Sequence, residues 1–233
     1  QPGTGWHFDP AKADEAGIPD TVVGILAERI ETLPGEVKKI LGVCSCLGTR
    51  FDIDTACDVG NFNLDKVFNA VRRGVDQGVV LYHDSSYYFA HDRIREAFYS
   101  AIPDDEKSLI HLKAGKVMLV NSSNDMTDVI AGHFRAGLSA VTSDSEREAI
   151  AVLNMSASKK ALAHAAYDSA LVYIRTAVSI ALPDCWDRDY DSALLLYTTA
   201  AEASFLSGDF GFMKQMTAEA LANAKNLMDK ISV

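Results

Sequence analysis

The sequence predicts a mainly α-helical protein that contains one small β-hairpin. Three observations indicate this class. Apolar residues recur at helical spacing over most of the chain, the spacing changes to alternation near residues 79–90, and one helical pattern recurs loosely in the second half. Of the 233 residues, 48% are hydrophobic and 23% are charged, which is typical of a folded globular protein.

The first 48 residues are predicted to form an irregular lead-in and then two helices. Residues 1–18 show no periodicity, and Leu33-Pro34 ends a helical pattern that covers residues 19–33. A second pattern begins near Pro34 and stops at Gly48. Its apolar stripe consists of Val37, Ile40, Leu41, Cys44 and Leu47.

A third clear helix is predicted after residues 49–59, which indicate a short extended piece and a helix of one or two turns. Asn63 is the predicted N-cap of the third helix, and Gly78 is its predicted end. Four apolar side chains of this helix are expected to face inward: Leu64, Val67, Phe68 and Val71.

The predicted hairpin follows the third helix. Residues 79–84 and 86–90 are short β-branched and aromatic runs that are separated at Asp84-Ser85. Three helices followed by a small hairpin are the element order of a winged-helix domain. The sequence therefore predicts a winged-helix domain over residues 19–102, after the lead-in at residues 1–18.

The second half of the chain is predicted to be entirely helical. Its helical patterns cover residues 91–102, 103–121, 143–165, 166–182, 188–208 and 209–231. Ser143-x-x-Glu146 predicts a capping box at the start of one of them.

Two of these patterns are related to each other. The stretch "AAYDSALVYIRTAVSIALP" has nearly the pattern of the second half of a tetratricopeptide repeat, and "SGDFGFMKQMTAEAL" repeats it loosely. Ala165 and Gly208 are 43 positions apart, which exceeds the roughly 34 residues of a standard repeat. Residues 103–233 are therefore predicted to form a tetratricopeptide-like solenoid of two or three α-helical hairpins with longer helices.

Four stretches together resemble one family of signalling proteins. They are "TVVGILAERIETLPGEVKKILGVCSCLGTRFD", "YYFAHDRIREAFYSAIPDDEKSLIHLKAGKVML", "YDSALVYIRTAVSIAL" and "YTTAAEASFLSGDFGFMKQMTAEALANAK". They resemble the segment that follows the P-loop core in large AAA-type signalling ATPases of the STAND class. The kinases with this module are multi-sensor histidine kinases and serine/threonine kinases.

This resemblance implies a function for the segment. It would be a non-catalytic regulatory and protein-interaction part of a signal-transduction ATPase/kinase, coupling nucleotide state to signal sensing in the cytoplasm. Its partners would be the upstream nucleotide-binding core, and a protein partner or a second copy through the helical repeats.

The stretch Ala90-His91-Asp92 resembles the Met-His-Asp motif of the STAND class, with alanine in place of methionine. In that class the histidine contacts a phosphate of bound ADP and holds the closed, resting state. The resemblance implies that His91 and Asp92 sense ADP once the ATPase core is present. The alternative is that Asp92 caps the following helix and His91 is its half-buried neighbour.

The chain contains no sequence that predicts catalysis of its own. A G-x-x-x-x-G-K-[ST] loop is absent, and "QPGTGWHFD" lacks the Lys-Ser/Thr pair, so ATP or ADP is expected only in the parent protein. Cys44-Ser45-Cys46 is not a C-x-x-C pair, and the acidic cluster Asp187, Asp189 and Asp191 is predicted to complement a helix dipole. We therefore expect no metal site, no cofactor and no enzyme activity in this segment.

Two alternative functions are weighed against the regulatory segment. The first is a stand-alone tetratricopeptide-like adaptor that binds a protein in a groove around four tyrosines, namely Tyr167, Tyr173, Tyr190 and Tyr197. The second, weaker alternative is a winged-helix DNA-binding regulator with a basic face over residues 62–76. The net charge of −10 disfavours nucleic acid as a partner, and no apolar run is long enough to span a membrane.

Overall fold

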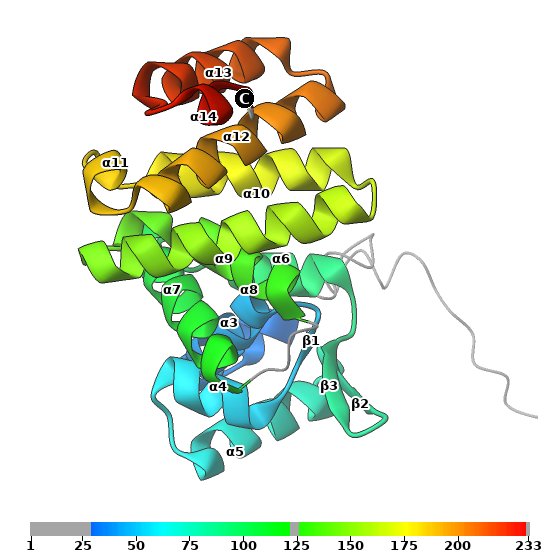
Figure 1. Ribbon diagram of the computed structural model, residues 1–233. Helices are drawn as coiled ribbons and strands as arrows, with labels where there is room; N and C mark the ends of the chain where they lie inside the picture. The colour runs from blue at the N-terminus through cyan, green and yellow to red at the C-terminus, as the bar shows by residue number, and fades with distance from the viewer. Residues whose placement is uncertain (1–28, 122–125, 232–233) are drawn as a thin grey trace, which may run out of the picture. The chain divides into compact units, whose positions relative to one another are not determined.

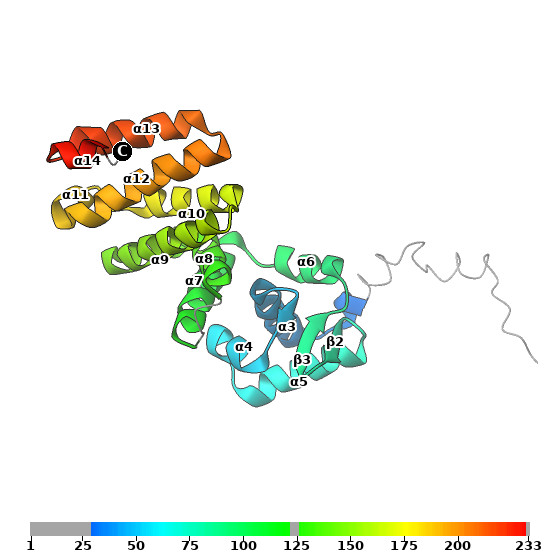
Figure 2. The same cartoon turned by 45° about the vertical axis from the view of Figure 1, so that its right-hand side comes forward.

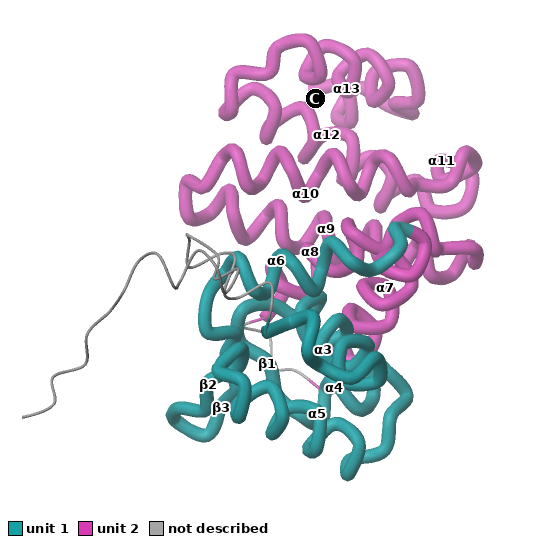
Figure 3. Tube along the Cα trace, turned by 180° about the vertical axis from the view of Figure 1, so that it is seen from behind, with its two compact units in different colours: residues 1–104 teal, residues 105–233 magenta. Residues whose placement is uncertain are grey.

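The computed structural model describes residues 29–121 and 126–231. It divides the chain into two compact units, residues 1–104 and residues 105–233, which are coloured separately in Figure 3. The predicted lead-in at residues 1–18 lies outside the described residues, as does most of the first predicted helix. The mainly α-helical class is confirmed, and no helix of the described part is long and apolar enough to cross a membrane.

The first unit consists of helices and a small antiparallel sheet (Figure 1). In chain order its elements are α3 (Gly35–Leu47), β1 (Arg50–Phe51), α4 (Ile53–Gly60), α5 (Leu64–Asp76), β2 (Val80–His83), β3 (Ser86–Phe89) and α6 (Asp92–Ser100). The strand order in the sheet is β1-β3-β2, and both pairs of neighbours are antiparallel. The predicted apolar stripe of α3 is buried in the core of this unit.

Two helices of the first unit begin at side-chain caps. The Asn63 Oδ1 atom accepts a hydrogen bond of 2.9 Å from the amide N–H of Lys66, so the predicted N-cap of α5 is confirmed. The Asp52 Oδ1 atom accepts one of 2.7 Å from the Thr55 amide and caps α4 in the same way. Each cap satisfies an N–H group that has no partner inside its helix.

The predicted inward face of α5 is half wrong. Val67 and Val71 are buried as predicted, but Leu64 is 57% exposed and Phe68 is 48% exposed. The buried stripe continues instead through the small residues Ala70 and Gly74. A Cβ atom on Gly74 would lie 2.9 Å from the Val80 side chain. Because α5 approaches β2 this closely, the face of α5 that carries small residues is the one that packs inward.

The predicted hairpin is confirmed. Strands β2 and β3 pair from Val80–Phe89 at one end to His83–Ser86 at the other, beside α5 in Figure 2. Both turn residues have positive φ, 47° at Asp84 and 59° at Ser85, which is the backbone of a type I′ turn. The twist of this turn matches the right-handed twist of the strands that it joins.

The second unit is a succession of helices. They are α7 (Asp104–Asn121), α8 (Thr127–Ala136), η2 (Leu138–Ala140), α9 (Asp144–Ala163), α10 (Tyr167–Ile180), α11 (Cys185–Arg188), α12 (Tyr190–Ser207), α13 (Phe210–Asn223) and α14 (Leu227–Ile231). The long helices α9, α10, α12 and α13 lie side by side in chain order (Figure 2). The last predicted helix is two helices, α13 and α14, and α8 was not predicted.

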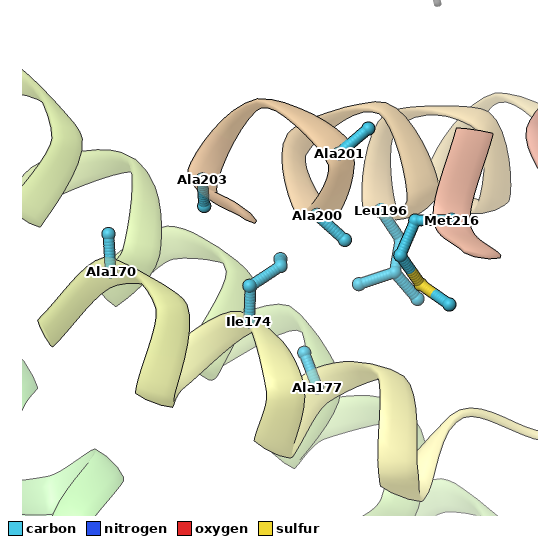
Figure 4. Packing of buried hydrophobic residues seen from close by; sticks show 8 residues of the cluster. All are labelled: Ala170, Ile174, Ala177, Leu196, Ala200, Ala201, Ala203 and Met216. Atoms are coloured by element: carbon cyan, nitrogen blue, oxygen red, sulfur yellow. The ribbon is translucent and has the colours of Figure 1, made fainter. Parts of the chain in front are cut away.

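Small residues form the seam between α10 and α12. Ala170, Ile174 and Ala177 of α10 point toward α12, and Ala200 and Ala203 of α12 point back toward them (Figure 4). All five side chains have no exposed surface. Because alanine side chains are short, the two helix backbones approach closely and enclose Ile174.

The predicted capping box at the start of α9 is wrong. Ser143 occupies the N-cap position, but its hydroxyl is hydrogen-bonded to the Ser145 hydroxyl and not to the helix backbone. Glu146 forms an ion pair with Lys116 of α7 and does not reach back to Ser143. An ion pair between two elements has therefore replaced the local reciprocal cap.

Two histidines face each other between α7 and α8. His111 and His133 are 8% and 7% exposed, and their Nδ1 atoms are 2.9 Å apart. Burial lowers the pKa of His111, and it lowers the pKa of His133 to about 4 with a further contribution from His111. One neutral ring donates and the other accepts, so the pair holds α7 and α8 together in its uncharged form.

Gly137, the residue that follows α8, lies directly against the backbone of α7. A Cβ atom on Gly137 would lie 2.6 Å from the Leu112 backbone nitrogen, whereas a Cβ atom on Gly132 of α8 would meet nothing within 4 Å. We expect Gly137→Ala to destabilise the second unit by about 1–3 kcal/mol, because a backbone must move. We expect Gly132→Ala to stabilise it by about 0.5–1 kcal/mol, because alanine is the better helix former.

Urea unfolding of the two glycine variants tests this difference in sign. The Trp186 fluorescence of the second unit is a suitable signal once Trp6 is replaced by phenylalanine, because the chain has two tryptophans. Equal midpoints for Gly137→Ala and Gly132→Ala would contradict the close contact at Gly137.

Candidate functional site

The junction between β3 and α6 carries the sequence-predicted residues His91 and Asp92. The strand side of this junction is fixed by two backbone hydrogen bonds of 3.0 Å. Phe89 N–H donates to the Thr49 carbonyl, and Ala90 N–H donates to the Val79 carbonyl. The junction is therefore held from both neighbouring segments of the first unit before the helix begins.

His91 is the N-cap residue of α6. Its Nδ1 atom accepts a hydrogen bond of 3.1 Å from the Arg93 amide N–H, and its backbone is extended. The alternative that the His-Asp pair caps this helix is confirmed in part: the capping residue is His91 and not Asp92, because Asp92 is already the first residue of the helix. His91 is exposed and not half-buried as that alternative expected. An imidazole nitrogen here accepts the hydrogen bond that a Ser, Thr, Asp or Asn oxygen accepts at a typical N-cap.

Asp92 is held by a different contact. Its Oδ1 atom accepts a hydrogen bond of 3.2 Å from the Thr49 hydroxyl, which lies just before β1. This bond ties the first turn of α6 to the sheet. The carboxylate also lies in the first helical turn, where the helix dipole favours a negative charge.

The capping bond determines the tautomer of His91. Because Nδ1 accepts the Arg93 N–H, the neutral ring carries its proton on Nε2. The exposed ring therefore offers one N–H donor away from the helix. A phosphate oxygen is a strong acceptor for such a donor, so the geometry is chemically suited to an anion.

The four sequence-predicted tyrosines lie in three different surroundings. Tyr190 and Tyr197 are brought together by Trp186, whose ring stacks on Tyr197 at 5.1 Å and lies 5.8 Å from the Tyr190 ring. Tyr167 lies at the start of α10 and lines a hollow of about 360 Å³ with residues near the end of α12. Tyr173 lies near Asp128 of α8.

The environment of each tyrosine is distinct as well. Burial, with a smaller effect from the Cys185 thiol, raises the pKa of Tyr197 to about 12. The Tyr190 hydroxyl donates to Asp229 and accepts a hydrogen bond of 2.9 Å from the Lys225 N–H, so it fastens α14 to the start of α12. The prediction of one shared tyrosine groove is therefore not matched by where these side chains lie.

A hollow that sequence reasoning missed lies beside α11. It has a volume of about 450 Å³ and is bounded by α9, α11, α12 and the end of α10. Its apolar lining includes Ala151, Val152, Met155, Leu182 and Leu196. We call it the α11 hollow. No pattern over neighbouring residues marks it, because its lining comes from several helices that are separate in the sequence.

The predicted acidic cluster is partly a cap. The Asp189 Oδ1 atom accepts a hydrogen bond of 3.1 Å from the Ser192 amide and begins α12. The hydrogen bond from the Ser192 hydroxyl and, after it, the bond from the Ser192 amide lower the pKa of Asp189. Its place at the helix start agrees with the predicted complement to the helix dipole. Within residues 29–121 and 126–231, no group of three His, Cys, Asp or Glu side chains could hold a metal ion.

The third helix offers few free cations for nucleic acid. Lys66 of α5 pairs with Glu36 at 2.6 Å. Arg72 and Arg73 line a hollow of about 760 Å³ that Glu36 and Asp76 also line. The mixed charge of this surface does not favour contacts with a phosphate backbone.

These observations define a mainly α-helical protein of two units with an exposed histidine at a strand-to-helix junction. The chain is 19% identical over 286 residues to the hybrid signal transduction histidine kinase G of Dictyostelium discoideum. The match covers 94% of this chain and 8% of that kinase. No family model matches the chain, and no solved structure matches it.

Proposed function

We propose that the chain is a non-catalytic regulatory and protein-interaction segment of a large signal-transduction ATPase/kinase that acts in the cytoplasm. The similarity to a hybrid histidine kinase supports a signalling context, because it extends over 94% of the chain. Since the chain spans 8% of that kinase, the activity of a whole parent protein is part of the proposal. The nucleotide would be bound by an upstream P-loop core of the STAND class.

The two units would divide this work. We propose that the first unit is a winged-helix domain, because its helices precede a hairpin that pairs with a short first strand. We propose that the second unit is a tetratricopeptide-like solenoid, because α9 packs on α10 and α12 packs on α13 as successive hairpins. The solenoid would receive the signal or a protein partner.

His91 is the observation that carries the nucleotide-sensing part of the proposal. Its Nδ1 atom is committed to the helix cap, so the Nε2–H group is the donor that could reach a phosphate of ADP on the upstream core. The hydrogen bond between Thr49 and Asp92 connects the first turn of α6 to the segment before β1. Loss of the phosphate contact would release the first unit from the core.

Calorimetric titration with ADP tests this proposal in a longer protein that includes the upstream core. We expect His91→Ala and His91→Ser to weaken ADP binding by about 1–3 kcal/mol, roughly five- to 150-fold. Serine preserves the helix cap but removes the imidazole donor, so it separates the two roles of His91. This chain without the core is expected not to bind ADP.

A second exposed histidine provides the control. His83 lies at the end of β2 and pairs with Asp84 at 3.0 Å, so His83→Ala removes a histidine without touching the junction. Its ADP affinity should equal that of the parent. If His91→Ser binds ADP as tightly as the parent while His91→Ala does not, His91 is only a helix cap.

A second candidate function is a stand-alone tetratricopeptide-like adaptor. The α11 hollow favours it, because an apolar depression beside two successive helical hairpins suits a protein ligand. This function would leave ADP binding unaffected by His91 in any longer protein, so the same titration separates the two candidates.

A further inference from the structure

The α11 hollow combines an apolar floor with an exposed edge. Met155, Leu182 and Leu196 lie at the floor and are largely covered, whereas Val152 is 56% exposed at the side of α9. Helices α9 and α12 begin at the same end of the stack, and α11 lies there too (Figure 1). An exposed aliphatic side chain next to a hollow provides apolar surface that a ligand can cover.

The rim of the α11 hollow is acidic. Arg188 of α11 donates to Asp184 at 2.8 Å, to Glu148 at 2.9 Å and to Asp144 at 3.4 Å. Asp189 lines the hollow as well. Three carboxylates thus pair with one guanidinium group, and the side chains of these three are about half exposed.

We propose that the α11 hollow docks a cationic amphipathic helix of a partner protein. This inference rests on the protein-interaction role proposed above and names the chemistry of the partner. Leucine or methionine side chains of such a helix would enter the hollow, and its lysines or arginines would pair with the carboxylates of the rim. An acidic segment would be repelled, and a neutral one would gain no attraction from the carboxylates of the rim.

The charge of the chain argues against a second copy as the occupant. With a net charge of −10, two copies repel each other at an acidic surface, whereas a cationic segment is attracted to it. Charge complementarity therefore selects a partner that differs from this chain.

In the absence of a partner, Arg188 of this chain pairs with the carboxylates that the partner's cation would bind. It links α11 to Glu148 and Asp144, which belong to α9 and lie 40 and 44 positions away in the sequence. A lysine or arginine of the partner would compete for these two carboxylates and free α11 from α9. Trp186 is part of α11, so its environment would change when this happens.

Fluorescence titration of the full chain with a designed peptide tests the proposal. The probe is a synthetic lysine–leucine helix of about 15 residues with leucines at i, i+3, i+4 and i+7. A Trp6→Phe background makes Trp186 the one indole signal. We expect saturable binding, and we expect Val152→Lys to weaken it by about tenfold or more, since it places a like charge at the hollow.

Val172→Lys is the matched control. Val172 is 38% exposed on α10 and does not line the α11 hollow, and the variant carries the same net charge as Val152→Lys. Its peptide affinity should equal that of the parent. A glutamate–leucine peptide of the same spacing should not bind.

Four results would overturn the proposal. They are no saturable binding of the lysine peptide, equal weakening by Val152→Lys and Val172→Lys, equal binding of the glutamate peptide, and a dimer of the parent that Val152→Lys abolishes. The last result would assign the hollow to a second copy. None of these results touches ADP binding through His91, so failure here is distinguishable from failure of the nucleotide-sensing function.

Discussion

Ile174→Ala is expected to lower the free energy of unfolding of the second unit by about 2–5 kcal/mol. Ile174 has no exposed surface and projects from α10 into the seam with α12. Its neighbours across the seam, Ala200 and Ala203, have no rotatable carbon chain that could move into the space left behind. The cavity would therefore stay open, which places the expected cost toward the upper part of this range.

The same helix offers a control for this substitution. Val172→Ala shortens a side chain of α10 that is 38% exposed, so it should change the free energy of unfolding by less than about 1 kcal/mol. Urea titrations followed by Trp186 fluorescence in the Trp6→Phe background measure both variants. Similar costs for the two substitutions would show that Ile174 is not enclosed as the structure has it.

Acidification is expected to destabilise the second unit through the buried pair of His111 and His133. In the folded state the pKa of His133 is about 4, below the roughly 6.5 of an exposed histidine. The unfolded chain therefore binds more protons between these two values, and stability falls as the pH falls through this window. The full contribution is present above about pH 6.5.

The size of this effect follows from the difference between the two pKa values. It is on the order of 2 kcal/mol between pH 7 and pH 5, and on the order of 3 kcal/mol by pH 4. Carboxylates whose pKa values are lowered in the fold, such as Asp184, Asp189 and Asp209, stay ionised at pH 5 and do not contribute there. The interval from pH 7 to pH 5 therefore isolates the histidines.

Urea unfolding at pH 7 and pH 5 measures this dependence. His133→Gln should reduce it, because glutamine keeps a hydrogen-bonding partner for His111 and does not titrate, while His111 still contributes. His164→Gln is the control, since His164 is exposed near the end of α9. An NMR titration of the His133 ring that gives a pKa near 6.5 would contradict the buried pair even if a variant fails to fold.

The helices and the hairpin could be predicted because their signals are local. Asn63 before an apolar stripe predicted the start of α5, and alternation around Asp84-Ser85 predicted the turn between β2 and β3. The inward face of α5 could not be predicted as reliably, because the approach of β2 to Gly74 decides it. Hydrophobicity alone predicted that Phe68 is buried, whereas in the folded unit its side chain is 48% exposed.

The candidate site was only partly predictable for the same reason. The His91-Asp92 pair stood out at a strand-to-helix junction, but which of the two residues caps α6 depends on where the helix begins. The α11 hollow is lined by α9, α11, α12 and the end of α10, and the ion pairs beside it join Arg188 to carboxylates 40 and 44 positions earlier in the sequence. No pattern over neighbouring residues carries that information, so the hollow appears only once the helices are in place.

The alanine seam between α10 and α12 also limits how this sequence can diverge. A larger residue at Ala170 or Ala177 would find no compensating reduction across the seam, because Ala200 and Ala203 are already small. Drift at these positions is therefore confined to glycine or serine, while the outward positions of the same helices can change freely. Descendants of such a chain would share residue sizes long after they had ceased to share residue identities.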